Sequence, residues 1–337
     1  MFEDDEETSN HAPPPSDAFE NAPNLRSLSL AAPSGDLKFS FDLEFPFSQL
    51  FDLAITNAPA DYLVRVCQEA SNLTRLTIAM NSMSSHFLAM PLCTLSCLKS
   101  LVAYDFSTPD YYGSLGSPSL PVIEPSCRIG TLLAKFSCPI LNEITIHTFP
   151  QLPESDYPSF KNDIVSFFAR SPLITRIDLD VRLNYDDSNI LLDILEYCPS
   201  LEQLKINHQG VFTATLFERL TYNTAATELP LCPRLRVFDG GHHHKPVSVP
   251  ALVNMVASRW HVADDAPVAR LQSLTMTFDD ADCAAQLGEF AAEGLKLTLH
   301  KPRNKQEMKM GLSLGRADSA SGSNSEGNGP SEQGGCT

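Results

Sequence analysis

The sequence lacks an excess of basic residues. It carries 24 Lys and Arg against 41 Asp and Glu, which gives a formal net charge of −17. Nucleic-acid binding requires Lys and Arg to neutralise phosphates, and an anionic membrane surface attracts polybasic segments. We therefore expect neither a nucleic acid nor a membrane as the partner.

Long apolar runs are also missing. No run reaches the length of about 20 residues that spans a bilayer. The stretch from Met1 to Glu7 has neither the basic nor the apolar part of a signal peptide. We expect an intracellular protein, cytoplasmic or nuclear, with reduced thiols. The nine cysteines are odd in number, and we interpret Cys138, Cys198 and Cys232 as small buried apolar groups.

Motifs of catalysis and of metal binding are absent from the sequence. It contains no G-x-S-x-G, P-loop, G-x-G-x-x-G or H-E-x-x-H. The run from His242 to His244 falls in a predicted loop, where successive side chains point in different directions. Cys93 and Cys97 have no second pair at zinc-finger spacing. We expect no metal, no cofactor and no enzymatic activity.

What the sequence does contain is one apolar template, L-x-x-L-x-L, in many copies. Leu201, Leu204 and Ile206 form a clear copy. The copies at 98 and 235 are weaker, and a final strand is expected at 295–299. Copies begin at residues 25, 50, 73, 98, 141, 174, 201, 235 and 271. The shorter intervals between them match the period of a leucine-rich repeat.

Helical patterns alternate with these copies. We predict helices over 61–70, 159–170, 187–197, 248–260 and 281–293. Ser248 is expected to be an N-cap, Gly294 a helix stop, and Trp260 an anchor of the helical layer. The predicted fold is α/β, a curved leucine-rich-repeat solenoid with parallel strands on the concave face and helices on the convex face. Each unit can bury its leucines only against the next unit.

Composition divides the chain into three parts. We expect a disordered acidic arm at 1–20, a repeat domain of about nine or ten irregular repeats at 21–302, and a disordered Gly/Ser-rich tail at 303–337. An insertion at 107–125, rich in Pro, Gly, Ser and Tyr, interrupts the repeats. Because such long loops are often functional, we expect it to lie beside the concave face.

Three segments carry a resemblance to a known family. The segments 171–179, 198–206 and 232–236 resemble repeats of F-box/leucine-rich-repeat proteins, above all the divergent sets found in fungi. The resemblance covers about residues 21–300. It implies repeats that hold a protein substrate and an F-box that docks on the linker subunit of an SCF ubiquitin ligase. The acidic stretch before the repeats does not have the apolar helical positions of an F-box. SCF components are therefore expected partners only if an F-box is encoded upstream.

The expected function is therefore non-catalytic recognition of another protein, resembling the substrate receptors of SCF ubiquitin ligases. The alternative is a free-standing leucine-rich-repeat scaffold without a ubiquitin link. An enzyme is disfavoured, because a solenoid presents a surface instead of the closed pocket that most active sites need.

The outward side chains of the predicted strands indicate where a partner would bind. Positions 1, 4 and 6 of the template point into the core, whereas positions 3, 5 and 7 point outward, because strand side chains alternate. The outward rows are small and neutral at both ends of the array and charged in the middle. The candidate partner-binding residues on the concave face are Glu143, His147, Arg176, Asp178, Asp180, Lys205, Asn207 and Asp239.

A second interpretation of the central charges stays open. Asp178, Lys205 and Asp239 would form a cross-strand charge ladder that supports the sheet, with each pair contributing roughly 0.2–1 kcal/mol. The two interpretations are compatible, because a ladder of side chains can also face a partner.

Overall fold

A computed structural model describes eleven stretches of the chain. The described residues are 22–31, 45–58, 60–80, 90–105, 128–148, 157–181, 188–207, 212–224, 230–241, 248–277 and 281–300. The predicted arm at 1–20, the insertion at 107–125, the tail at 303–337 and the run from His242 to His244 lie outside them.

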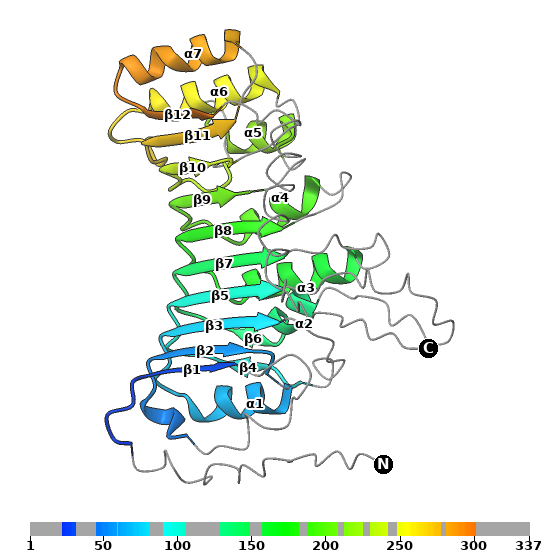
Figure 1. The fold of residues 1–337 in the computed structure, drawn as a ribbon. Helices are drawn as coiled ribbons and strands as arrows, with labels where there is room; N and C mark the ends of the chain where they lie inside the picture. Colours follow the sequence, from blue (N-terminus) through cyan, green and yellow to red (C-terminus); the bar gives the residue numbers. More distant parts are fainter. Residues whose placement is uncertain are drawn as a thin grey trace, which may run out of the picture. The chain divides into compact units, whose positions relative to one another are not determined.

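Ten strands form one parallel sheet and follow one another in it in chain order (Figure 1). They are β1 (Ser27–Ala31), β2 (Asp52–Thr56), β3 (Arg75–Met80), β5 (Ser100–Asp105), β7 (Glu143–Thr148), β8 (Arg176–Val181), β9 (Gln203–Ile206), β10 (Val237–Asp239), β11 (Ser273–Thr277) and β12 (Lys296–His300). Every predicted strand region contributes one of these strands, including the two weak copies. The fold is therefore α/β with a ten-stranded parallel sheet.

Strand pairing aligns equal positions of the template. Leu76 of β3 pairs with Leu101 of β5, which pairs with Ile144 of β7, and Ile144 pairs with Ile177 of β8. These fourth-position side chains are buried, like those at the sixth position. A shift of one residue would turn the apolar side chains to the other face of the sheet, so the pattern determines the register.

Several strands are entered through the same tight turn, Cys-Pro-x-Leu. The leucine N–H donates to the cysteine carbonyl at 3.0 to 3.1 Å, which closes a turn with proline at its second position, where its fixed φ is favoured. The turns join Cys138 to Leu141, Cys198 to Leu201, and Cys232 to Leu235. All three cysteines are buried, which confirms the prediction for them.

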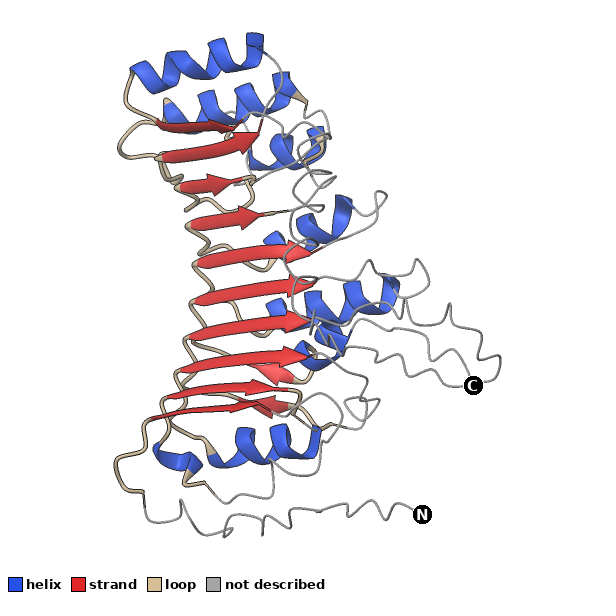
Figure 2. Cartoon of the chain, in the orientation of Figure 1, coloured by secondary structure: helices blue, strands red, loops and turns tan. Residues whose placement is uncertain are grey.

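Helices cover one face of this sheet (Figure 2). The described elements besides the ten strands are η1 (Phe47–Gln49), α1 (Ala60–Glu69), α2 (Arg128–Leu133), α3 (Tyr157–Ala169), α4 (Ser188–Glu196), α5 (Ala214–Leu220), α6 (Val249–Trp260), α7 (Ala281–Ala292), and the short paired strands β4 (Cys93–Thr94) and β6 (Phe136–Ser137). Their apolar side chains join those of strand positions 4 and 6 in one continuous core. The core therefore lies between the sheet and this second layer.

The five predicted helices are present as α1, α3, α4, α6 and α7, each within two residues of the expected ends. Gly294 follows α7 with φ +114°, which confirms it as a helix stop. The prediction for Ser248 is only partly right: it occupies the N-cap position of α6, but its side chain caps no N–H. Trp260 is buried at the end of α6, as expected of an anchor.

Candidate functional site

The eight predicted partner-binding residues lie together on four neighbouring strands. Their side chains belong to template positions 3, 5 and 7 of β7 to β10, and Asn207 follows directly after β9. We call the surface formed by these three positions along the sheet the polar face. It is the opposite face to the one that carries positions 4 and 6 and the helices, because strand side chains alternate.

At position 3, an ion pair joins β7 and β8. Glu143 lies opposite Arg176 in the register, and the guanidinium Nη1 lies 3.0 Å from Oε1. Both side chains are about half exposed, at 48% and 54%, so the pair contributes at most about 1 kcal/mol to stability. A similar pair, Arg75 with Asp52 at 2.8 Å, joins β2 and β3. The expectation that this end of the sheet carries no charge is therefore wrong.

At position 5, Lys205 of β9 reaches across to β8. Its Nζ donates to Oδ2 of Asp178 at 2.7 Å. The hydrogen bond to Asp178 is the main cause of a raised pKa for Lys205; partial burial opposes it, and the charges of Asp178, Asp239 and Asp180 add to it. The lysine is thus held in its charged form. The other oxygen of Asp178, Oδ1, is buried without a hydrogen-bond donor among the described residues.

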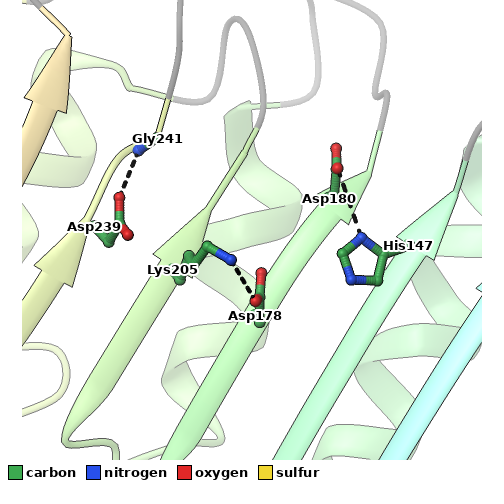
Figure 3. Close-up of polar contacts among 6 residues, drawn as sticks. All are labelled: His147, Asp178, Asp180, Lys205, Asp239 and Gly241. Atoms are coloured by element: carbon green, nitrogen blue, oxygen red, sulfur yellow. Dashed lines mark hydrogen bonds and ion pairs between the residues drawn. The ribbon is translucent and has the colours of Figure 1, made fainter. Parts of the chain in front are cut away.

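Asp239 does not extend the predicted charge ladder. Although it lies opposite Lys205 in the register, its Oδ1 accepts a hydrogen bond from the backbone N–H of Gly241 at 2.9 Å (Figure 3). Within the described part of the chain, no cation lies within ion-pair distance of it. The ladder therefore ends at the contact between Asp178 and Lys205.

At position 7, an aromatic stack leads to a carboxylate. The rings of Tyr104 on β5 and His147 on β7 are 5.1 Å apart and nearly parallel, with an interplanar angle of 10°. Nδ1 of His147 lies 3.6 Å from Oδ2 of Asp180 on β8. Tyr104 was not among the predicted site residues. Its place at position 7 of the copy at 98, directly opposite His147, is the feature of the sequence that could have identified it.

Asn207 and the end of β10 pack closely against each other. Gly241 has φ +56°, and a Cβ on it would lie 2.2 Å from Oδ1 of Asn207. The Gly241 carbonyl accepts a hydrogen bond from the Thr277 hydroxyl at 2.7 Å. Gly241 and Thr277, the position-7 residues of the last two of these copies, are both buried.

Two cysteine thiols outside the polar face contact each other. The thiols of Cys67 on α1 and Cys93 on β4 are hydrogen-bonded to each other, which lowers the pKa of Cys93 to about 7 and raises that of Cys67. Cys93 is buried, whereas Cys97 is only partly buried. In the described residues, no group of three or more His, Cys, Asp or Glu is placed to hold a metal ion.

None of the described helices has the length and apolar character to cross a membrane. A scan against protein-family models found no match, and a search of the curated proteins found none either. The polar face is consequently the feature from which a function can be proposed.

Proposed function

We propose that this protein is a leucine-rich-repeat solenoid whose polar face binds another protein, in the manner of the substrate receptors of F-box/leucine-rich-repeat adaptors. The observation that carries the proposal is the central polar face, where four in-register strands present a continuous row of charged and hydrogen-bonding side chains. No catalytic step is part of this proposal.

The repeat assignment is supported by how the units connect. Each template copy forms a strand that pairs only with the strands next to it in chain order, two in the middle of the described sheet and one at each end. The same entry turn recurs before β7, β9 and β10. Nearest-neighbour pairing of similar units is the defining property of a repeat array.

Recognition is supported by the fixed geometry of the polar side chains. Arg176, Lys205 and His147 each contact a carboxylate on an adjacent strand, so their conformations are restrained before a partner arrives. Restraining side chains in advance reduces the entropy lost on association. A surface on rigid strands therefore suits a protein partner with complementary charges.

A free-standing scaffold is the second candidate. It is favoured by the internal pairing of Glu143 with Arg176 and of Asp178 with Lys205, because these groups already satisfy one another. In that case the pairs would support the sheet, and the polar face would need no partner.

Reversing one ion pair tests the proposal. The double change Asp178→Lys with Lys205→Glu exchanges the charges but keeps their attraction, so the fold should survive while the charge pattern changes. The matched control, Lys161→Glu with Asp193→Lys, exchanges a pair on α3 and α4, where Nζ lies 2.5 Å from Oδ2. Proteins cross-linked to each variant in cells would be quantified by mass spectrometry.

We expect the amount of each specific cross-linked partner to fall about tenfold or more with the polar-face exchange, because a charge-assisted contact is lost. The control exchange should leave that amount unchanged. Equal thermal unfolding midpoints would show that both variants are folded. Partners unaffected by either exchange would contradict recognition by the polar face. Recovery of the SCF linker subunit and cullin would favour the adaptor over the scaffold.

A further inference from the structure

We propose that the partner of the polar face is a cationic segment, with two Arg or Lys side chains that bind Asp180 and Asp239. This inference rests on the proposed function and adds the chemical class of the partner. It is carried by the charge balance of the polar face, by the fixed carboxylates and by the distance between them.

The charge balance of the polar face between β7 and β10 is negative. Two permanent cations, Arg176 and Lys205, stand there among four carboxylates. Each cation is already paired, with Glu143 and Asp178 respectively. The other two carboxylates, those of Asp180 and Asp239, have no Lys or Arg within ion-pair distance among the described residues. Two negative charges therefore remain for a partner to neutralise.

These two carboxylates lie close to the same ammonium group. Asp239 and Asp180 both contribute to the raised pKa of Lys205, together with the directly bonded Asp178. Figure 3 shows Lys205 turned toward Asp178, with Asp239 turned toward Gly241 instead. One ammonium thus stands among three carboxylates, and its direct bond goes to only one of them.

Each surplus carboxylate has a described neighbour at one oxygen and another oxygen still available. The backbone N–H of Gly241 engages Oδ1 of Asp239, and His147 lies beside Oδ2 of Asp180. His147 is itself restrained by its stack on Tyr104. The contacts of the described residues leave Oδ2 of Asp239 and Oδ1 of Asp180 as acceptors. A guanidinium is well suited to such carboxylates, because its donors form strong charge-assisted hydrogen bonds.

The separation of the two carboxylates sets the spacing expected in the partner. Asp180 and Asp239 lie two strands apart and two residues apart along the strands. With strands about 4.8 Å apart and a rise of about 3.3 Å per residue, their Cα atoms are roughly 12 Å apart. An extended peptide advances about 13 Å over four residues and returns to the same side. The basic side chains should therefore stand at positions i and i+4.

An acidic partner is the contrary possibility. It would have to bind Arg176 or Lys205, and both cations are already neutralised by a carboxylate of the neighbouring strand. Its own charge would also be repelled by Asp180 and Asp239. The cationic segment is therefore the occupant that the charges favour.

Binding of short synthetic peptides to the full chain tests the inference. The probe is a fluorescent Gly/Ser peptide with two arginines four positions apart, compared with one-arginine and two-glutamate versions in fluorescence anisotropy. The site variant is Asp180→Asn with Asp239→Asn. The control variant, Glu218→Gln with Glu289→Gln, makes the same change in net charge at exposed helical positions.

We expect the two-arginine peptide to bind best, and the site variant to weaken that binding about tenfold or more, since each carboxylate supplies a charge-assisted contact. The control variant should change it less than about twofold, because exposed charges away from the site act only through screened long-range attraction. Raising the salt concentration should weaken binding to the wild type.

Three results would overturn the inference: no binding of the two-arginine peptide, equal losses in both variants, or tighter binding of the two-glutamate peptide. The proposed function would survive these results if cellular partners were still lost on exchange of Asp178 and Lys205. If cellular partners are lost on that exchange but peptide binding is unaffected by Asp180→Asn with Asp239→Asn, the inference of a cationic segment is rejected. The proposed recognition by the polar face then still stands.

Discussion

Arg259 shows how a single charged residue can connect neighbouring units. It is fully buried, and burial lowers the pKa of its guanidinium to about 10. Its three nitrogens donate to the carbonyls of Leu220 at 2.6 Å, Leu231 at 2.7 Å and Cys232 at 3.1 Å. The Leu220 carbonyl lies at the end of α5, and a cation is favoured near the C-terminus of a helix. The other two carbonyls lie in the turn into β10.

Arg170 uses the same arrangement elsewhere in the helical layer. From the end of α3 it donates to the carbonyls of Ala134 at 2.6 Å and Phe136 at 3.1 Å, next to α2 and β6. In both cases an arginine of one unit satisfies backbone carbonyls of the preceding unit. Backbone groups buried between irregular connections therefore obtain the hydrogen bonds that they need.

Buried thiols should make the protein less stable at alkaline pH. Burial raises the pKa of Cys138 from its ordinary value of 9.0 to about 12. Above pH 9 the unfolded thiol loses its proton while the folded thiol keeps it, so the free energy of unfolding falls as the pH rises. We expect Cys138→Ala to reduce the loss of stability between pH 8 and pH 10 by about 1 kcal/mol.

Urea unfolding of both proteins at the two pH values, with a reductant present, measures this difference. The change with pH is compared within each protein, so a lower overall stability of the variant does not affect the result. Equal losses in wild type and variant would contradict a raised pKa for Cys138.

At the scale of elements, two glycines should respond to alanine in opposite ways. Gly241 ends β10 with φ +56° and has no room for a Cβ beside Asn207. Gly288 lies inside α7, where a Cβ would meet no atom within 4 Å. We expect Gly241→Ala to lower the free energy of unfolding by about 1–3 kcal/mol because of backbone strain. Gly288→Ala should raise it by about 0.5–1 kcal/mol, because alanine favours the helix.

Denaturant titrations of the two variants and the wild type provide the measurement. Each substitution adds the same methyl group, so each serves as a control for the other. Shifts in the same direction for both variants would contradict the different roles assigned to Gly241 and Gly288.

For the whole molecule, protection of backbone N–H groups should decrease from the middle of the sheet toward both ends. β7 and β8 each pair with two strands, whereas β1 and β12 each pair with one strand of the described sheet. The apolar side chains of the end strands, such as Leu28 and Leu299, are also only partly buried. Local opening therefore exposes less apolar surface at the ends and costs less free energy.

Hydrogen exchange followed by mass spectrometry would measure this gradient. We expect peptides that contain β7 and β8 to exchange most slowly, and peptides that contain β1 or β12 to exchange fastest among the strands. Uniform exchange across the ten strands would indicate that the sheet opens only as one cooperative unit.

The sequence by itself determined the ten strands, the strand positions that are buried, and five of the helices. These features follow from local rules: alternation of side chains along a strand, helical periodicity over nine or more residues, and proline in the entry turns. The two weak copies still form strands because their neighbours pair on both sides. α2 and α5 are too short for periodicity to show, and β4 and β6 have only two residues each.

The tertiary structure alone decided which charges neutralise one another. The sequence places Asp178, Lys205 and Asp239 on neighbouring strands, but only the folded chain turns Lys205 to Asp178 and Asp239 to the N–H of Gly241. It also buries Arg259 against carbonyls 27 to 39 residues away. Such choices depend on side-chain conformations and on the backbone between distant units. A local pattern of residue types does not contain that information.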